Sequence, residues 1–458
     1  MRKTMKPTRR GFMAGATAAL SAPALLSATR AYAANPKIRV GHVSPRTGPL
    51  AGFAEADDYV LSAIEQSFAG GLQNNGKTWD IEIISKDSQS NPNRAAEVAA
   101  DLILGDEVDI IVAASTPETV NPVSDQAEVN EVPCITTDCP WQPYFFGRNG
   151  VPGEGFQSTY HFFWGVNQIV DSYVSLWDQL DTNKKVGMLL SNDNDGVSQS
   201  DPKTGMAAKL RERGYEVLDG GLFEPLSDDF SAQIGKMREA GVDIVTGVFL
   251  PPDWTTFYVQ AVQQGFRPKA TTVAKALLFP ESVAALGELG HNLTCEVWWS
   301  PHHPYTSSLT GQSAADLAGE FEDYAKRQWT MPLGFIHGLF EVALDAIKRA
   351  DDPTDGDTVA EAVAATEAGQ AYFDRLRPLL DDSHTRLTQR TLARVLRVHF
   401  RRVRARVLGP DISHRRTLVR GVVGSPAVRQ AIEEAASANR SNALKERKRA
   451  ERYAREIA

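Results

Sequence analysis

Apolar and polar positions follow two alternating rhythms along the chain. Short runs rich in β-branched residues are typical of buried parallel strands, and the stretches between them carry apolar residues at helical spacing. The expected strands are 37–43, 79–85, 108–113, 132–135, 185–190, 216–222, 244–250 and 271–277. The expected helices are 57–68, 93–104, 120–130, 203–213, 230–240 and 255–265.

Strands that alternate with helices predict parallel sheets with helices on both faces. The series pauses near residues 162–169 and then begins again with the same rhythm. The fold class is therefore α/β, with two doubly wound parallel-sheet lobes around a hinge. We expect the first part of lobe 1 at 34–164 and lobe 2 at 165–298.

The net charge of −8 for the 458 residues hides two regions of opposite sign. Residues 34–370 carry 22 Lys and Arg against 48 Asp and Glu, whereas residues 371–458 carry 21 against 9. The arginines that crowd residues 397–406 argue against a buried strand, so we expect an α-helical basic tail at 368–458. Such a tail favours weak contact with an anionic membrane surface, and no nucleic-acid partner is expected.

The N-terminus has the pattern of an export signal. Thr8–Met13 contains the twin arginines Arg9 and Arg10, an Ala-rich apolar stretch follows, and Ala31-Tyr32-Ala33 offers a cleavage site. A membrane anchor would need a longer apolar span, and a lipoprotein signal would need a Cys at the cleavage point. We therefore expect residues 1–33 to be a Tat signal peptide cleaved after Ala33, and the protein to be periplasmic.

The sequence favours a protein that is not an enzyme. The motifs typical of phosphate loops, dinucleotide sites, zinc proteases and serine hydrolases do not occur, so no catalytic residue, cofactor or metal is expected. Cys134 and Cys139 enclose four residues. In an oxidising compartment they form either a disulfide or two small buried thiols, and the sequence leaves both interpretations open.

Residues 36–367 resemble the leucine/isoleucine/valine-binding family of periplasmic binding proteins. The matching segments stand in the family's order: 47–53, 122–125, 132–136, 229–234, 241–245, 252–253 and 332–335. The resemblance implies a type I periplasmic binding protein fold, with 299–367 returning to lobe 1. It also implies a non-enzymatic component of an ABC uptake system that binds a small-molecule solute and delivers it to permease subunits.

The expected site lies beyond the carboxyl ends of the strands, where doubly wound sheets bind ligands. Hydroxyl groups and free N–H groups at helix starts suit a carboxylate, acidic side chains suit an ammonium, and aromatic side chains form apolar walls. The hydroxyl candidates are Ser115, Thr116 and Thr137, the acidic candidates are Asp195 and Asp253, and the aromatic candidates are Phe53, Trp141 and Trp254. The expected ligand is a small carboxylate-bearing solute such as an amino acid.

The candidate residues have structural alternatives. Ser115 or Thr116 would equally serve as a helix N-cap, as would Asp253 for the helix that follows it. Trp141 and Trp254 are equally suited to plain packing. The resemblance makes Asp253 the ammonium anchor, because the family has a Glu there. Asp195 departs from the family's usual aromatic, which puts an aliphatic amino acid in doubt as the ligand.

A second resemblance lies in the tail. Leu408–Arg416, Ser425–Val428 and the last helix, 445–458, are similar to a region that precedes the catalytic domain of bacterial membrane-bound glycerol-3-phosphate acyltransferase. The family's His-x-x-x-x-Asp pair is missing, because Val419 stands where His414 would need an Asp. The alternative function is thus a catalytically inert fragment related to that enzyme; a fused reading frame and a sensor without transport also remain open.

Overall fold

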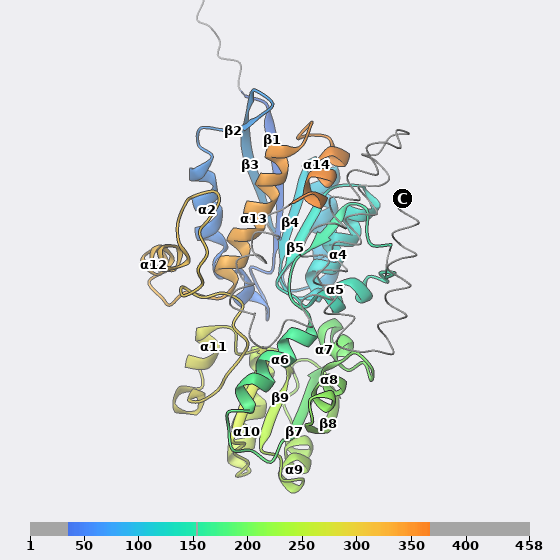
Figure 1. Cartoon of the computed structure of the whole chain (residues 1–458), viewed down its shortest axis with the longest axis vertical. Helices are drawn as coiled ribbons and strands as arrows, with labels where there is room; N and C mark the ends of the chain where they lie inside the picture. Colours follow the sequence, from blue (N-terminus) through green and yellow to red (C-terminus); the bar gives the residue numbers. More distant parts are fainter. Residues whose placement is uncertain (1–34, 153, 367–458) are drawn as a thin grey trace, which may run out of the picture. The chain divides into compact units, whose positions relative to one another are not determined.

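The computed structural model describes residues 35–366 except residue 153. The expected signal peptide (1–33) and basic tail (368–458) therefore lie outside the described residues. All elements below belong to the compact unit that begins at Lys37. They form a six-stranded sheet in the order β2-β3-β1-β4-β5-β6 and a four-stranded sheet in the order β10-β9-β7-β8 (Figure 1).

The six-stranded sheet is parallel except for one edge strand. Its strands are β1 (Lys37–Ser44), β2 (Leu72–Asn74), β3 (Lys77–Asp87), β4 (Ile110–Ala114), β5 (Cys134–Thr137) and β6 (Thr159–His161). Only β2 runs antiparallel, as a hairpin partner of β3. Because β1, β4 and β5 are parallel neighbours, their carboxyl ends lie at one edge of the sheet.

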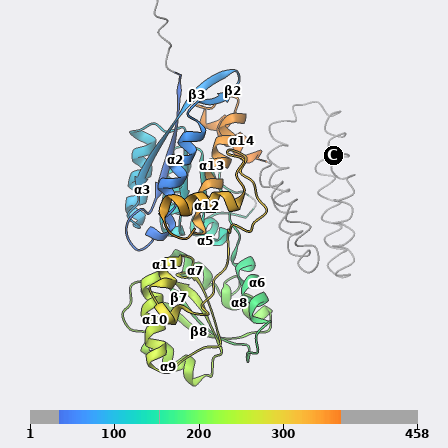
Figure 2. The ribbon, with the colours of Figure 1, turned by 90° about the vertical axis from the view of Figure 1, so that its left-hand side faces the viewer.

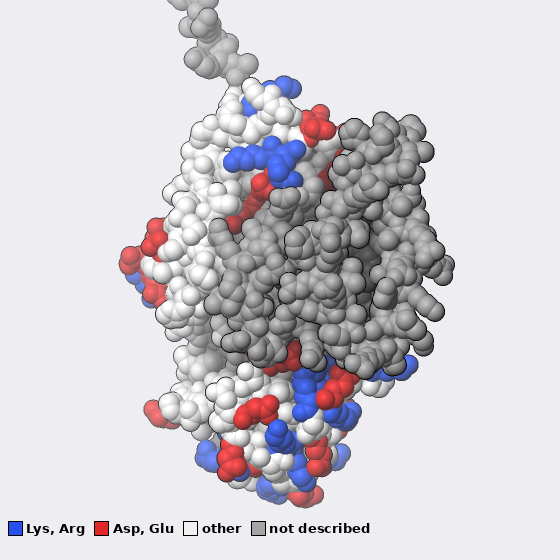
Figure 3. All heavy atoms as spheres, viewed as in Figure 1, with Lys and Arg blue, Asp and Glu red and all other residues white. Residues whose placement is uncertain are grey.

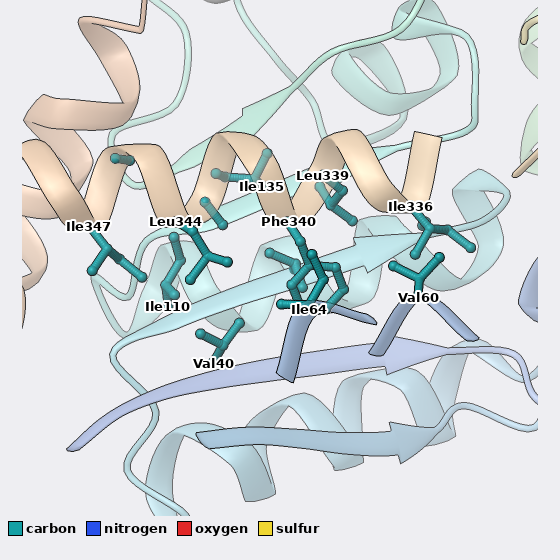
Figure 4. Close-up of a cluster of buried hydrophobic side chains, with 14 of the residues drawn as sticks. Val40, Val60, Ile64, Ile110, Ile135, Ile336, Leu339, Phe340, Leu344 and Ile347 are labelled. Carbon is teal, nitrogen blue, oxygen red and sulfur yellow. The ribbon is translucent and has the colours of Figure 1, made fainter. Parts of the chain in front are cut away.

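Helices cover both faces of this sheet. On one face lie α2 (Asp57–Ser67) and α13 (Pro332–Arg349), and on the other α3 (Pro92–Leu104) and α4 (Pro117–Val129). Figure 4 shows Leu344 of α13 beside Ile110 and Val40 of the sheet, and Ile336 and Phe340 beside Val60 and Ile64 of α2. Two further helices, α12 (Ala314–Ala325) and α14 (Gly356–Ala364), join the same cluster, so the chain after the second sheet packs back onto the first.

The four-stranded sheet is parallel throughout. Its strands are β7 (Lys185–Ser191), β8 (Glu216–Phe223), β9 (Ile244–Phe249) and β10 (Ala270–Lys275). One face is covered by α6 (Val166–Trp177) and α8 (Met206–Glu212), the other by α9 (Ser231–Glu239) and α10 (Pro251–Gln263) (Figure 2). The two doubly wound sheets confirm the predicted α/β class.

Local sequence explains where many helices begin. Proline stands at the start of α3, α4, α10 and α13, where its missing N–H costs no helical hydrogen bond. Asn91 caps α3 by accepting a hydrogen bond from the Arg94 N–H at 3.0 Å. The chain therefore turns sharply from strand to helix, which brings helix N-termini close to the strand ends that they follow.

The structure adds short elements that the pattern did not predict. These are η1 (Ala51–Ala54), α5 (Trp141–Gly147), α7 (Asn194–Gln199), α11 (Pro280–Ala284) and η2 (Gly287–Gly290). Asp193 caps the N-terminus of α7, because its carboxylate accepts a hydrogen bond from Gly196 N–H at 2.8 Å. The helix expected at 203–213 begins only at Met206, since Asp201 holds the preceding turn through Lys203 N–H and Thr204 N–H.

Three negative findings apply to the described residues alone. None of their helices is long and apolar enough for a membrane crossing. They contain no group of three or more His, Cys, Asp or Glu arranged to hold a metal ion. Figure 3 shows basic and acidic side chains interleaved over the visible face that carries α8, β8 and α9, so this face has no continuous patch of one sign.

Candidate functional site

A small buried cavity lies where the carboxyl-terminal edges of the two sheets face each other. Its lining residues come from both sheets and from the segments that follow them: Phe53, Thr116, Asp138, Cys139, Pro140, Phe163, Ile169, Asp195, Gln199, Ala274, Lys275, Leu278, Glu296 and Trp298. The cavity volume is ≈ 20 Å³, which is room for about one water molecule. An amino acid therefore fits only if the walls move apart.

Two hydroxyl groups at the start of α4 are buried and unpaired. Thr116 is the N-cap residue of α4, but its side chain makes no capping hydrogen bond. The hydroxyl oxygens of Ser115 and Thr116 have no hydrogen-bond partner among the described residues. The N-cap alternative is thus not realised. Thr116 lines the cavity, whereas its chain neighbour Ser115 is not among the lining residues. Since buried hydroxyls are normally paired, the Thr116 hydroxyl is available to a ligand there.

The chain after β5 contributes a residue that sequence reasoning missed. Thr137, a predicted site residue, donates its hydroxyl hydrogen to the Phe162 carbonyl at 2.8 Å and does not line the cavity. Asp138, the next residue, does line it. Asp138 is 3% exposed, has a left-handed backbone with φ of 74°, and neither carboxylate oxygen has a hydrogen-bond partner among the described residues. Its position directly after a strand was the available signal.

A buried lysine links both sheets at the cavity. Lys275 ends β10, and its Nζ lies 2.8 Å from Asp193 Oδ2, 3.6 Å from Glu118 Oε2 and 3.9 Å from Asp195 Oδ2. Glu118 belongs to α4 on the first sheet, and it also accepts a hydrogen bond from Asp195 N–H at 3.3 Å. The predicted site residue Asp195 therefore lies in a charged cluster that spans the two sheets.

Burial and charge set the protonation of this cluster. Burial raises the pKa of Asp195 to about 7, against the lowering effect of Lys275, with Asp193 and Glu118 adding to the rise. Burial acts in the same sense on Asp193, but contact with Lys275 brings its pKa below the ordinary value. Burial alone would lower the pKa of Lys275, yet the three acids raise it. The lysine is thus charged, whereas Asp195 is only partly ionised near pH 7.

Glu296 is a second acid that the sequence did not reveal. It lines the cavity, and its Oε2 accepts a hydrogen bond from the Tyr173 hydroxyl at 2.5 Å. Burial raises the pKa of Glu296, and the hydrogen bond from Tyr173 opposes that rise. Asp138, Asp195 and Glu296 together give the cavity three carboxyl groups, against one lysine that is already shared among acids.

Aromatic side chains form one wall. Phe53, a predicted site residue, lies with its ring centroid 6.0 Å from that of Trp298 in a stacked arrangement. Phe163 meets Trp298 edge-on at 4.9 Å. Phe53 lies in η1, which follows β1 of the first sheet, whereas Trp298 comes after the last strand of the second sheet. Both residues belong to an apolar cluster that also contains Leu278 and Phe279. The wall is therefore assembled from both sides.

Besides Ser115 and Thr137, three predicted site residues do not line the cavity: Trp254, Asp253 and Trp141. Trp254 packs inside the second sheet's core against Phe249 and Phe257, which is the packing alternative. Asp253 stands inside α10 rather than at its N-cap, because the helix already begins at Pro251. Burial raises its pKa to about 6, and the nearby backbone groups of Leu226 and Ser227 oppose that rise.

Trp141 begins α5, and its backbone N–H donates to the Trp164 carbonyl at 3.2 Å. Its indole lies 5.8 Å from the ring of Phe146 and is not part of the cavity wall. Cys134 and Cys139 are free thiols, so the disulfide interpretation was wrong. Cys139 instead has the imidazole of His161 at 4.0 Å, a neighbour distant in sequence.

Comparison with known proteins identifies the fold and the family. A sequence profile described as "Periplasmic binding protein" matches residues 37–389, more than three quarters of the chain. The chain belongs to the periplasmic binding protein family. The match runs past residue 367, where the sequence resemblance was expected to stop.

Solved structures of such proteins share the fold at low sequence identity. A leucine-binding protein of Thermotoga maritima is 20% identical, with a TM-score of 0.59, over 72% of this chain and 87% of its own. A branched-chain amino acid transporter binding protein of Streptococcus pneumoniae, solved with isoleucine, is 19% identical with a TM-score of 0.56. The match covers 72% of this chain and 88% of that protein. A solute-binding protein of R. palustris, solved with 4-hydroxybenzoate, is 16% identical with a TM-score of 0.56. The match covers 72% of this chain and 84% of that protein.

A different similarity covers a short segment. The glycerol-3-phosphate acyltransferase of Ectopseudomonas mendocina is 49% identical over 84 residues, which is 18% of this chain and 10% of that enzyme. The Pseudomonas aeruginosa enzyme is 48% identical over 85 residues, again 10% of its length. The chain thus spans about a tenth of the curated relatives that it matches, so their activity is not carried over by this similarity.

Proposed function

We propose that this protein is the extracytoplasmic solute-binding component of an ABC uptake system. It binds a small carboxylate-bearing solute such as an amino acid in the cavity between its two sheets. Phe53, Ser115, Thr116 and Asp195 are the predicted site residues that this proposal retains. The protein delivers the solute to permease subunits and performs no catalysis of its own.

The observation that carries the proposal is the pair of unpaired hydroxyls at the N-terminus of α4. Ser115 and Thr116 are buried with no partner for either hydroxyl oxygen, which is costly unless a ligand completes the hydrogen bonds. The helix N-terminus adds free N–H groups and a positive end of the helix dipole. This combination suits the carboxylate of a solute.

The walls of the site supply a closing mechanism. The cavity is lined from both sheets and is too small for an amino acid, so the solute enters when the sheets move apart and is enclosed when they return. The chain passes from the first sheet to the second through the segment between β6 and α6, and returns ahead of α12. We propose that these segments act as the hinge.

Export and delivery complete the proposal. The twin-arginine segment and Ala31-Tyr32-Ala33 support transport of the folded precursor across the inner membrane, with cleavage after Ala33. Of the relatives, the S. pneumoniae protein is described as a transporter substrate-binding protein. The basic tail contributes at most weak contact with the membrane surface, and the acyltransferase-like segment contributes no activity.

Isothermal titration calorimetry with the full mature chain tests this function. The panel contains phenylalanine, leucine, lysine, glutamate, benzoate and 4-hydroxybenzoate. We expect saturable one-site binding of at least one member, and a Ser115→Ala, Thr116→Val double variant should bind that solute at least tenfold more weakly, since each hydroxyl contributes about 1 kcal/mol.

A matched control uses hydroxyls outside the cavity. A Thr255→Val, Thr256→Ala double variant alters two α10 hydroxyls that bond only their own helix backbone, to Pro251 and Pro252. Its affinity should equal that of the wild type. Absence of binding across the panel, or equal affinity in the Ser115, Thr116 variant, contradicts the proposed function.

A further inference from the structure

The cavity lining contains three acidic side chains, Asp138, Asp195 and Glu296, but one basic side chain, Lys275. Asp138 is the extreme case, because it is buried, lines the cavity and has no hydrogen-bond partner for either carboxylate oxygen among the described residues. A buried carboxyl group without a partner costs folding free energy. Such a cost persists in a protein when the group serves a ligand.

The backbone of Asp138 carries a second cost. Its φ of 74° lies in the left-handed region, which side chains other than glycine seldom adopt. The residue directly follows β5 and begins the connection to Pro140, so this conformation fixes the carboxylate at the carboxyl edge of the first sheet. Strain and an unpaired buried carboxyl group at one cavity residue point to a binding role.

Aromatic side chains in the lining of the same cavity supply a second element of a cation site. Phe53, Phe163 and Trp298 line the same cavity, with ring centroids 4.9 Å apart for the Phe163–Trp298 pair and 6.0 Å apart for Phe53–Trp298. Aromatic faces attract organic cations, and indole does so most strongly. The only cation in the lining, Lys275, is already held by Asp193, Glu118 and Asp195.

We propose that Asp138 is the anchor for an ammonium group of the solute, which it holds against the aromatic wall of Phe53, Phe163 and Trp298. This inference rests on the proposed function and specifies its solute class as an amine-bearing zwitterion rather than a plain carboxylic acid. It moves the ammonium anchor from Asp253 in the second sheet to Asp138 in the first. The hydroxyls of Ser115 and Thr116 remain for the carboxylate.

The surrounding titratable groups agree with this assignment. The pKa of Asp138 is raised well above its ordinary value by burial and then by the nearby Asp57. Asp195, Glu296, Cys139 and Lys275 face the same cavity. An ammonium that enters at neutral pH would therefore displace a proton from this group of carboxyls, and calorimetry in two buffers of different ionisation enthalpy would detect the release.

The test compares Asp138→Asn with Asp253→Asn in the full mature chain, using two matched ligand sets. The first set is phenylalanine, 3-phenylpropanoate and 2-phenylethylamine. The second is leucine, 4-methylpentanoate and 3-methylbutylamine. We expect the amino acid of the better-bound set to bind at least tenfold more tightly than its deaminated acid.

Asp138→Asn should weaken binding of that amino acid at least tenfold, remove most of this preference over the deaminated acid and reduce proton release. Asp253→Asn should leave affinity and preference unchanged. Thermal melting without ligand checks the fold, and Asp138→Asn should melt at the same temperature as the wild type or higher, because it removes a buried carboxyl group that has no hydrogen-bond partner.

The outcomes separate the two proposals. Binding of a deaminated acid as tight as that of its amino acid leaves the proposed function standing and overturns the ammonium anchor. Loss of affinity in Asp253→Asn but not in Asp138→Asn overturns the anchor as well. A large drop in melting temperature for Asp138→Asn assigns the residue a structural role, against the proposal. If no ligand of either set binds to the wild type, the ammonium anchor is overturned, whereas the proposed function fails only if the whole calorimetry panel also shows no binding.

Discussion

Lys275 Nζ lies 3.6 Å from Glu118 Oε2, and this ion pair joins β10 of the second sheet to α4 of the first. The lysine is 4% exposed, so water screens the contact little. The backbone N–H of Asp195 donates to the same glutamate. Glu118 therefore links the two sheets through a charge and a hydrogen bond that require no ligand.

Glu118→Gln should favour separation of the sheets. The variant weakens the link while Lys275 keeps Asp193 at 2.8 Å, so the fold is retained. Because solute binding needs the closed arrangement, we expect affinity to fall about threefold to tenfold. The control is Glu212→Gln, whose Lys209 partner lies on the same helix. Calorimetry with the best solute measures both, and equal affinity in Glu118→Gln would show that the link does not hold the closed form.

Removal of the lysine should be far more damaging. Lys275→Met leaves Asp193, Asp195 and Glu118 buried without their cation, and breaking a buried ion pair costs about 3–5 kcal/mol. The loss should be smaller at pH 5 than at pH 8, because Asp195, whose pKa burial raises to about 7, is then protonated. Urea unfolding followed by tryptophan fluorescence measures it, with Lys184→Met at an exposed ion pair as control. A loss below about 1 kcal/mol at pH 8 would contradict the account.

The acids with raised pKa values should make the protein less stable as pH rises. Burial raises the pKa of Asp57 to about 7, despite Ser44 and Arg46, so folding favours its protonated form. Its contribution to the free energy of unfolding is fully present below the unfolded-state pKa of about 4. As the pH rises from there to pH 7, this contribution is lost, by up to about 1.4 kcal/mol per pH unit. Asp193, whose pKa is lowered, adds no slope in this window.

Asp57→Asn should flatten this dependence. Between pH 5 and pH 7.5 its free energy of unfolding should fall less than that of the wild type, and at pH 7.5 the variant should be the more stable of the two. Asp323→Asn on the exposed side of α12 serves as control and should follow the wild-type curve. Parallel curves for Asp57→Asn and wild type, measured by urea unfolding, would show that Asp57 does not titrate as described.

Export can be tested apart from binding. Replacing Arg9 and Arg10 by Lys together should leave the precursor in the cytoplasm, because the Tat pathway reads the arginine pair. Cell fractionation and immunoblotting measure the distribution, and Lys3→Arg, Lys6→Arg preserves the pair as a control. Normal periplasmic accumulation of the first variant would refute the Tat assignment.

Many of the long elements were predictable because their patterns are local, although the expected helices did not include α6, α12 or α13. Strands such as Ile244–Phe249 are continuous apolar runs, and α3 shows both an amphipathic stripe and a proline start. Elements such as β6, with 3 residues, and α7, with 6, are too short for periodicity to show. Their existence depends on pairing with β5 and on the Asp193 cap.

The candidate site was only partly predictable. Phe53, Thr116 and Asp195 line the cavity, because strand ends and the first loop fix their place. Asp138 and Lys275 went unnoticed because single charges at strand ends usually face solvent, and burial of a charge is a property of the assembled fold. Trp254 was predicted to line the site but packs in the core of the second sheet, since an aromatic residue after a strand suits either place.

Hydrogen–deuterium exchange with and without the best-binding solute tests the central claim, that one solute is enclosed between the two sheets. We predict slower exchange, at saturation, in four segments at once: 115–119 and 138–141 of the first sheet, and 195–199 and 275–278 of the second. Exchange in α9, outside the cavity, should not change. Protection confined to one sheet, or protection of neither in the presence of saturating solute, would contradict the account.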